Sequence, residues 1–119
     1  MNNRKVGTEK ERLATIFLNA NRVTIKEVNF ACRFGEIDII GYDNNQLVFF
    51  EVKYRKNNNK GYASDAVNLS KQKKICRVSD YYRYIHKISE NQSCRFDVIA
   101  IDGNDIDWIT NAFDYIPKY

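Results

Sequence analysis

The pattern of apolar and polar residues along the chain predicts two helices. Residues 8–21 carry apolar side chains at helical spacing, and Thr8 with Glu11 has the form of a capping box at which a helix begins. Ser70 is expected to cap a second helix. The buried stripe of this second helix is predicted from spacings of three and four, at Ile75, Val78, Tyr82 and Ile85.

Stretches of β-branched and aromatic residues predict five strands. Three follow the first helix, and two follow the second, at residues 22–31, 36–42, 46–54, 95–101 and, as a short strand, 106–110. The run Leu47-Val48-Phe49-Phe50 indicates a strand covered on both faces. Asp43-Asn44-Asn45 is typical of a hairpin turn. We therefore expect an α/β fold with an αβββαβ core, a mixed central sheet flanked by helices, and a loop over residues 55–67.

Length and composition fit one domain over residues 1–119, since 44% hydrophobic residues support one core. No apolar run is long enough to cross a bilayer, and no signal peptide follows the basic N-terminus. We expect a cytoplasmic protein with no membrane partner. The three cysteines lack metal-ligand spacing and are expected to be small, semi-buried side chains.

Charged residues interrupt the second and third strands at corresponding positions. If these strands pair about the predicted turn, Asp38 lies opposite Glu51 and Glu36 lies opposite Lys53. Opposed carboxylates repel each other unless one is protonated or a cation lies between them. One interpretation is a divalent metal ion held by both carboxylates, with Lys53 orienting a water molecule. The other is a solvated cluster in which Glu36 forms a salt bridge with Lys53.

Positive charge is concentrated directly after the third strand. The whole chain carries +4, whereas residues 53–77 contain eight basic residues and one acid, Asp65, and so carry +7. A basic segment beside a metal site suits a phosphodiester substrate. The residues expected to contact phosphate are Arg55, Lys56, Lys60, Lys71, Lys73, Lys74 and Arg77.

These motifs resemble the YraN-like family of small bacterial proteins. The resemblance covers nearly the whole chain and is carried chiefly by Gly35-Glu36-Ile37-Asp38, Phe50-Glu51-Val52-Lys53, Ser70-Lys71-Gln72-Lys73 and Arg95-Phe96-Asp97-Val98. The family is similar to the PD-(D/E)xK nuclease superfamily and, within it, to the archaeal Holliday junction resolvases. This similarity implies a restriction-endonuclease-like core. The Pro-Asp of the superfamily is absent, and Asp38 comes from Glu-Ile-Asp instead.

The resemblance also implies a site that holds Mg²⁺ or Mn²⁺. The implied catalytic residues are Asp38, Glu51, Lys53 and Gln72, and the implied metal ligands are Asp38, Glu51, Glu11 and the carbonyl of Val52. Glu11 matches a helical acid of the superfamily, with the capping box as its alternative role. Gln72 matches a position that supports the site, with a solvated helix terminus as its alternative.

The sequence thus predicts a metal-dependent endonuclease-like protein that acts on DNA, in a branched or structured form. One alternative is a nucleic-acid-binding module that kept the fold without catalysis, and another is a protein-interaction domain. The resolvase resemblance also suggests a homodimer, because cutting two strands symmetrically needs two sites.

Overall fold

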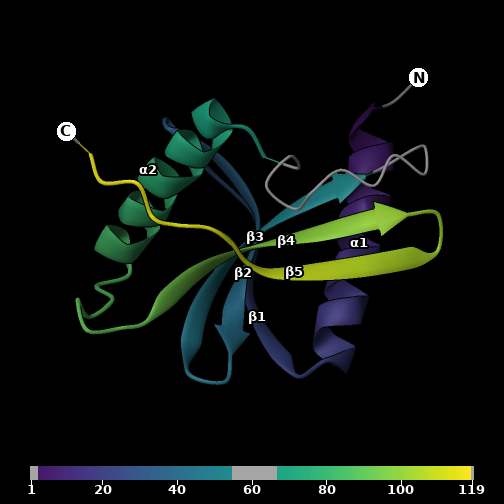
Figure 1. Ribbon diagram of the computed structural model, residues 1–119, viewed down its shortest axis with the longest axis horizontal. Coiled ribbons are helices and arrows are strands. Elements are labelled where there is room, and N and C mark those ends of the chain that lie inside the picture. The colour runs from purple at the N-terminus through teal and green to yellow at the C-terminus, as the bar shows by residue number, and fades with distance from the viewer. Residues whose placement is uncertain (1–2, 55–66, 119) are drawn as a thin grey trace.

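One helix covers each face of a five-stranded sheet in this protein (Figure 1). The computed structural model describes residues 3–54 and 67–118, with side chains from Glu9 onward. The elements in chain order are α1 (Asn3–Ala20), β1 (Val23–Cys32), β2 (Gly35–Asp43), β3 (Gln46–Tyr54), α2 (Leu69–Ile85), β4 (Cys94–Asp102) and β5 (Asp105–Phe113). The predicted αβββαβ order is confirmed, and it agrees with a restriction-endonuclease-like core.

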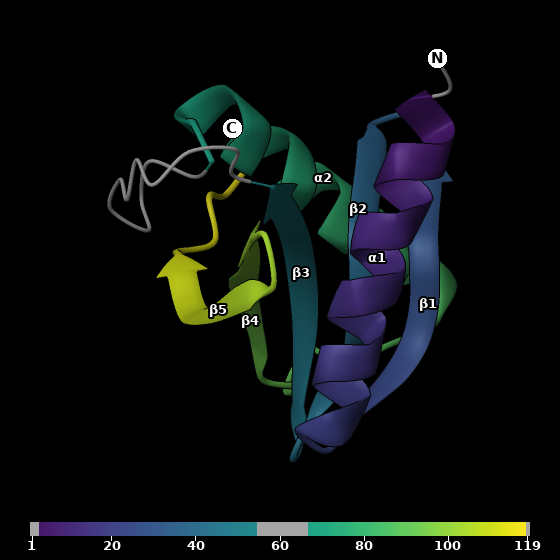
Figure 2. The same ribbon diagram turned by 90° about the vertical axis from the view of Figure 1, so that its right-hand side faces the viewer.

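The strands follow the order β1-β2-β3-β4-β5 across the sheet, as in the chain. β3 and β4 are parallel, and the other neighbours are antiparallel, so the sheet is mixed as predicted. A parallel pair needs a crossover connection, which α2 provides. Figure 2 shows α1 in front of β1, β2 and β3, with α2 behind the sheet. Within the described part of the chain, neither helix is long and apolar enough to cross a membrane.

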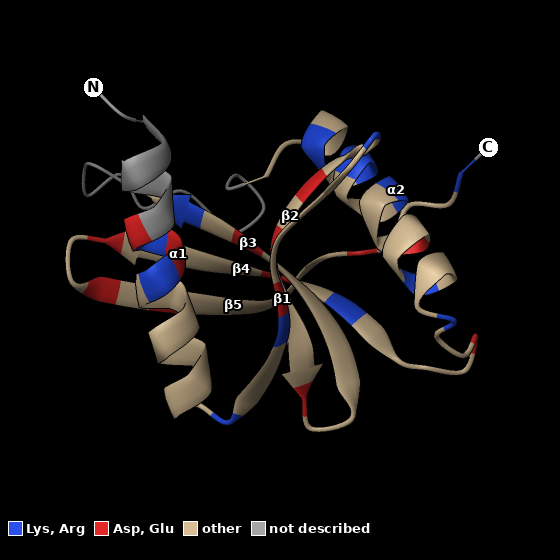
Figure 3. Cartoon of the chain, turned by 180° about the vertical axis from the view of Figure 1, so that it is seen from behind, with Lys and Arg blue, Asp and Glu red and all other residues tan. Residues whose placement is uncertain are grey.

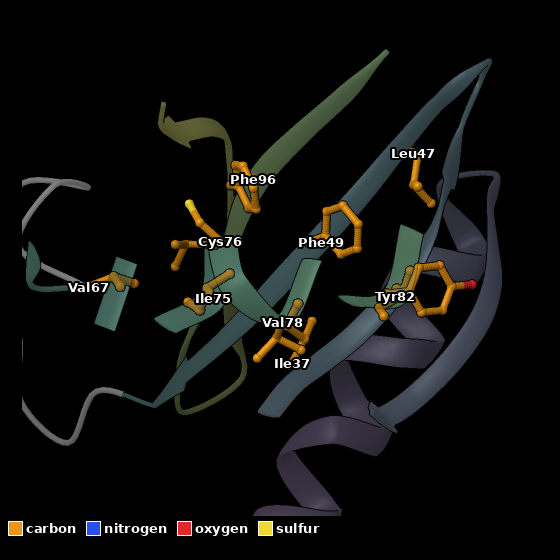
Figure 4. Close-up of a cluster of buried hydrophobic side chains, with 11 residues drawn as sticks. Ile37, Leu47, Phe49, Val67, Ile75, Cys76, Val78, Tyr82 and Phe96 are labelled. Atoms are coloured by element: carbon orange, nitrogen blue, oxygen red, sulfur yellow. The ribbon is translucent and has the colours of Figure 1, made fainter. Parts of the chain in front are cut away.

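β3 contributes side chains to both cores. Phe49 packs with Val78 and Tyr82 on the α2 side (Figure 4), whereas Phe50 packs with Leu18 on the α1 side. The run from Leu47 to Phe50 is at most 1% exposed, which confirms that both faces of this strand are covered. The last residues of β3, from Glu51 onward, therefore lie at the edge of a packed core.

The helix caps differ from those predicted. α1 begins at Asn3, so Thr8 and Glu11 lie inside the helix and the capping box is wrong. Arg and Lys favour helical conformation and extend α1 beyond the expected start. The N-cap of α2 is Asn68, whose side chain accepts the Lys71 N–H, and Ser70 lies within the first turn. Asn and Ser cap about equally well, so the sequence did not separate them.

Two element ends also differ. Ile85 is 42% exposed, because α2 ends there and its last turn is not covered, so only the first three positions of the predicted stripe are buried. β5 runs over nine residues rather than as a short strand. Its ladder with β4 carries it from Asp105 to Phe113, although its outer edge has no neighbouring strand within the described sheet.

Gly41 of β2 lies close against the backbone of β1. A Cβ atom there would be 2.6 Å from the Thr24 carbonyl oxygen and 3.2 Å from Val23 Cγ1. Since the nearest atom belongs to the backbone, it cannot move without shifting β1. We expect Gly41→Ala to lower the free energy of unfolding by about 1–3 kcal/mol, measured by urea titration. A loss below about 0.5 kcal/mol, the range of ordinary surface changes, would contradict this.

Candidate metal centre

β2 and β3 pair from the hairpin turn as far as Ile39 and Phe50, and then separate. This is the predicted register. Beyond it, the Asp38 side chain enters the gap, where its Oδ2 accepts the Val52 N–H at 2.7 Å. A carboxylate oxygen thus takes the place that a strand carbonyl normally has in the ladder. This substitution fixes the Asp38 carboxyl group between the strands, beside Glu51.

β1 is irregular beside Asp38. Asn29 has a φ of 56°, and no ladder pair joins it to Asp38, between the pairs Val28–Ile39 and Phe30–Ile37. Asn tolerates this left-handed conformation better than most residues. Side-chain alternation is broken at the same point, so that Ile37 and Ile39 belong to opposite cores although they are two residues apart. At this irregularity the Asp38 side chain belongs to neither of the two cores. It points along the sheet toward the Val52 N–H instead.

Glu11 of α1 joins this site. One carboxylate oxygen each of Glu11, Glu36 and Asp38 lies within 4.8 Å of the others. Asn29 holds Glu11 in place, since its Nδ2 donates to Glu11 Oε2 at 2.6 Å. Glu11 therefore lies beside Asp38, where the resemblance implies a ligand, and its alternative role in a helix cap is wrong.

Asp38 is destabilised as an anion. Burial, and then the neighbouring Glu51 carboxyl group, raise the pKa of Asp38 to about 7, while the Val52 N–H and Lys71 act in the opposite direction. Such a group favours either a proton or a nearby cation. At neutral pH the site therefore has an electrostatic reason to take up positive charge.

This pKa leads to a pH-dependent prediction for Asp38→Asn. The usual pKa is 3.8, so between about pH 4 and pH 7 the folded state holds the proton more often than the unfolded state. The free energy of unfolding of the wild type therefore falls as pH rises through this window and levels off above it. Asp38→Asn lacks this loss, so its stability advantage over the wild type should grow from about pH 4 to pH 7.

Urea titrations in EDTA across this range measure the difference. Asp107→Asn, at an exposed position of β5, makes the same chemical change away from the site and serves as the control. A stability difference between Asp38→Asn and wild type that stays constant with pH would contradict the prediction.

Glu51 is 5% exposed, and its Oε2 forms an ion pair with Lys71 Nζ from the first turn of α2. Burial alone would lower the pKa of Lys71, but the nearby carboxylates, chiefly Glu51, outweigh this effect and the pKa is raised. Lys53 is exposed and forms no ion pair within the described residues. The predicted opposition of Glu36 and Lys53 is wrong, because the β2–β3 ladder ends at Ile39 and Phe50. The strands have already separated at that point.

The other two predicted site residues make backbone contacts. Gln72 is half-buried, and its Nε2 donates to the Val67 carbonyl oxygen at 2.9 Å, so its contact is with the start of α2. Val52 is half-buried and gives its N–H to Asp38. Its carbonyl as a ligand, like the supporting role of Gln72, stays a prediction.

Of the seven predicted phosphate contacts, those on α2 can be placed, and Arg55, Lys56 and Lys60 lie outside the described residues. Figure 3 shows the basic residues of α2 gathered toward its N-terminal half. Lys73 and Lys74 are exposed. Arg77 lies beside Lys73 in a groove of about 470 Å³, which is also lined by Ile116, Pro117 and Lys118. The Arg77 side chain donates to the Ile116 carbonyl oxygen, and its Nε lies 3.4 Å from Asp80 Oδ2 in an ion pair.

Sequence reasoning missed two residues of the site. Glu36 was assigned to Lys53, although its spacing of two from Asp38 was a signal for a shared cluster. The role of Asn29 could not be predicted, because the presence of an asparagine within a strand does not by itself indicate a positive φ. Lys71 was expected to contact phosphate rather than Glu51.

Comparison with known proteins supports one family. A sequence profile described as "Uncharacterised protein family UPF0102" matches residues 10–101, which include all four acids of the site. A UPF0102 protein of Nitrosospira multiformis is 43% identical over 111 residues, covering 91% of this chain and 92% of the relative. One from Lachnoclostridium phytofermentans is 40% identical over 114 residues, covering 96% and 97%. One from Fusobacterium nucleatum is 40% identical over 111 residues, covering 93% and 92%.

Proposed function

Because the chain belongs to the uncharacterised protein family UPF0102, the YraN family that its motifs predict, we propose a function from the site itself. The protein is a metal-dependent endonuclease-like enzyme that acts on DNA, in a branched or structured form. The observation that carries this proposal is the Asp38 carboxyl group, fixed between two separating strands beside Glu51 and within 4.8 Å of Glu11 and Glu36 oxygens. Side chains that repel one another are held together here by the fold.

The residues present fit Mg²⁺ or Mn²⁺. Every side-chain donor is a carboxylate oxygen, which suits hard divalent ions and suits soft metals poorly. Asp38 and Glu51 would hold the ion, with Glu11, Glu36 and the Val52 carbonyl as further donors. Charge also favours this fit, because burial and the neighbouring Glu51 carboxyl group raise the pKa of Asp38, and a bound cation would stabilise its ionised form.

The chain's own residues have distinct roles in this proposal. The ion, when bound, lowers the pKa of a coordinated water and polarises a phosphoryl oxygen. Asp38 is oriented by the Val52 N–H, and Glu11 by the Asn29 side chain, so neither carboxylate needs to reorganise. Lys53 would orient the attacking water from the exposed end of β3. Gln72 would support the site through the start of α2.

The basic face of α2 supports a polyanionic substrate. Lys73, Arg77 and Lys118 line one groove, and among the described residues no acid lines it. Lys74 is exposed on the same helix. Such a field attracts phosphate backbones, and each neutralised phosphate makes binding more dependent on salt. The predicted contacts Arg55, Lys56 and Lys60 would extend this surface.

A cleavage assay tests the proposal. Wild-type protein is incubated with duplex, single-stranded and four-way junction DNA in Mg²⁺, in Mn²⁺ and in EDTA. We expect cleavage with either ion and none in EDTA, and a preference for the junction would support the structured substrate. Absence of cleavage from all three DNAs, with metal binding intact, would overturn the enzymatic proposal.

The second candidate is a nucleic-acid-binding module on the same fold without catalysis. It is favoured by the position of Lys53, which is exposed and makes no ion pair with the carboxylates in the described part of the chain. This candidate predicts DNA binding that weakens steeply with salt and is unchanged by EDTA. Fluorescence anisotropy over a salt series, with and without EDTA, measures this binding. The cleavage assay in Mn²⁺ separates the two candidates, since the enzyme should cleave and the module should not.

A homodimer is part of the proposal, because two symmetric cuts need two sites. α2 offers a surface for it: Tyr81, Tyr84 and Ile85 are 37%, 81% and 42% exposed. Light scattering after gel filtration should give twice the chain mass. A monomeric mass at the concentrations that cleave DNA would overturn this part of the proposal alone.

A further inference from the structure

The ion pair between Lys71 and Glu51 joins the metal site to the basic helix. Lys71 lies in the first turn of α2, and its ammonium group contacts Glu51 Oε2. Within the described residues, no other cation makes an ion pair with Glu11, Glu36, Asp38 or Glu51. Lys71 therefore supplies the positive charge that the carboxylates hold in the protein itself.

The two partners differ in their freedom to move. Glu51 is 5% exposed and lies on β3, which is flanked by β2 and β4. Lys71 is 49% exposed, and its long aliphatic stem leads from the surface of α2. If a divalent ion takes the Glu51 carboxylate, the ammonium group is the partner that can leave.

Electrostatics also favours exchange over coexistence. A divalent ion brings two positive charges to the carboxylates, and an ammonium group on Glu51 would then repel it at short range. Lys71 already interacts with Asp38 and Glu36 as well as Glu51, so it occupies the field that the ion would enter. Both cations therefore compete for one group of acids.

We propose that Lys71 is the resident counter-ion of this site: it positions Glu51 in the metal-free protein and is exchanged for the metal ion. The inference rests on the metal site of the proposed function. It assigns Lys71 a positioning role that differs from those of Lys73 and Lys74 on the same helix. Once released, the ammonium group is available to a substrate phosphate, so metal loading adds one cation to the DNA-binding surface.

Chemical labelling tests the exchange without any measurement of catalysis. An amine-acetylating reagent is applied in EDTA and in saturating Mn²⁺, and mass spectrometry gives the rate at each lysine. We expect Mn²⁺ to raise the acetylation rate at Lys71 about fivefold, because loss of an ion pair worth about 1 kcal/mol changes an equilibrium by that factor. The acetylation rate at Lys73 should stay unchanged. Lys73 is the matched control because it is exposed on the same helix.

Two variants sharpen the test. In Glu51→Gln, Lys71 should react at the fast rate with or without Mn²⁺. In Lys71→Gln, calorimetry should show Mn²⁺ binding about fivefold tighter than wild type, with Lys73→Gln unchanged. Mn²⁺ binding with unaltered labelling of Lys71 would overturn this inference and leave the metal site standing. Absence of Mn²⁺ binding by the wild type would overturn both.

Discussion

Replacing Glu51 with glutamine should lower metal-dependent cleavage of DNA by about 100-fold or more, since changes to outer-shell partners of metal ligands already cost about 10- to 100-fold. Glu51 is buried at the point where β2 and β3 separate, beside the Asp38 carboxyl group. Glutamine keeps the size of the side chain and removes its charge. The loss should therefore appear in turnover and in the concentration of Mn²⁺ needed for activity, while the fold is preserved.

The control is Glu90→Gln, the same chemical change at an exposed position between α2 and β4. Initial cleavage rates are compared over a Mn²⁺ series, with circular dichroism to confirm that both variants are folded. Glu51→Gln that cleaves within about threefold of the control, a difference of less than 1 kcal/mol in barrier height, would remove Glu51 from the site.

Asp97→Ala is expected to lower the free energy of unfolding by about 3–5 kcal/mol, the usual cost of breaking a buried ion pair from one side. Asp97 is fully buried, and both of its oxygens are occupied. Arg95 Nη2 donates to it at 2.9 Å, Trp108 Nε1 at 2.8 Å and the Asn111 N–H at 2.9 Å. Removal of the carboxylate leaves these donors without their shared acceptor.

Arg95 moderates that loss, because it also contacts Asp43 and Gln46, at 2.7 and 2.6 Å. Through these contacts one network ties β4 to β5 and to the hairpin between β2 and β3. Urea titration measures the effect, with Asp107→Ala on the exposed face of β5 as the control. A loss no larger than that of the control would show that the network contributes little.

The core of the site was accessible from the sequence because a short hairpin fixes strand register. The turn at Asp43-Asn44-Asn45 places Ile39 opposite Phe50, and so brings Asp38 beside Glu51. The rule fails beyond Ile39 and Phe50, where the ladder ends, because it assumes that pairing continues to Glu36 and Lys53. The strands separate there, next to the positive φ of Asn29 on β1, and strand periodicity encodes neither feature.

The contribution of the helices was harder to predict. Apolar spacing located both helices, but each began at a residue that differed from the expected cap. The approach of Lys71 to Glu51 depends on how α2 docks against the sheet. Charge counting instead assigned every basic residue of the window except Lys53 to phosphate, Lys71 included. Glu11, which the family resemblance implied as a ligand, does lie close to Glu36 and Asp38, and its role as a ligand stays a prediction.

Calorimetric titration of Mn²⁺ into the wild type and Asp38→Asn, at pH 8, tests the metal site most directly. At this pH the wild-type carboxyl group, whose pKa is about 7, is largely ionised. We predict that the wild type binds Mn²⁺ at a specific site and that Asp38→Asn, which should be at least as stable, binds it about 100-fold more weakly or not at all. Equal affinity in the two proteins would contradict the account.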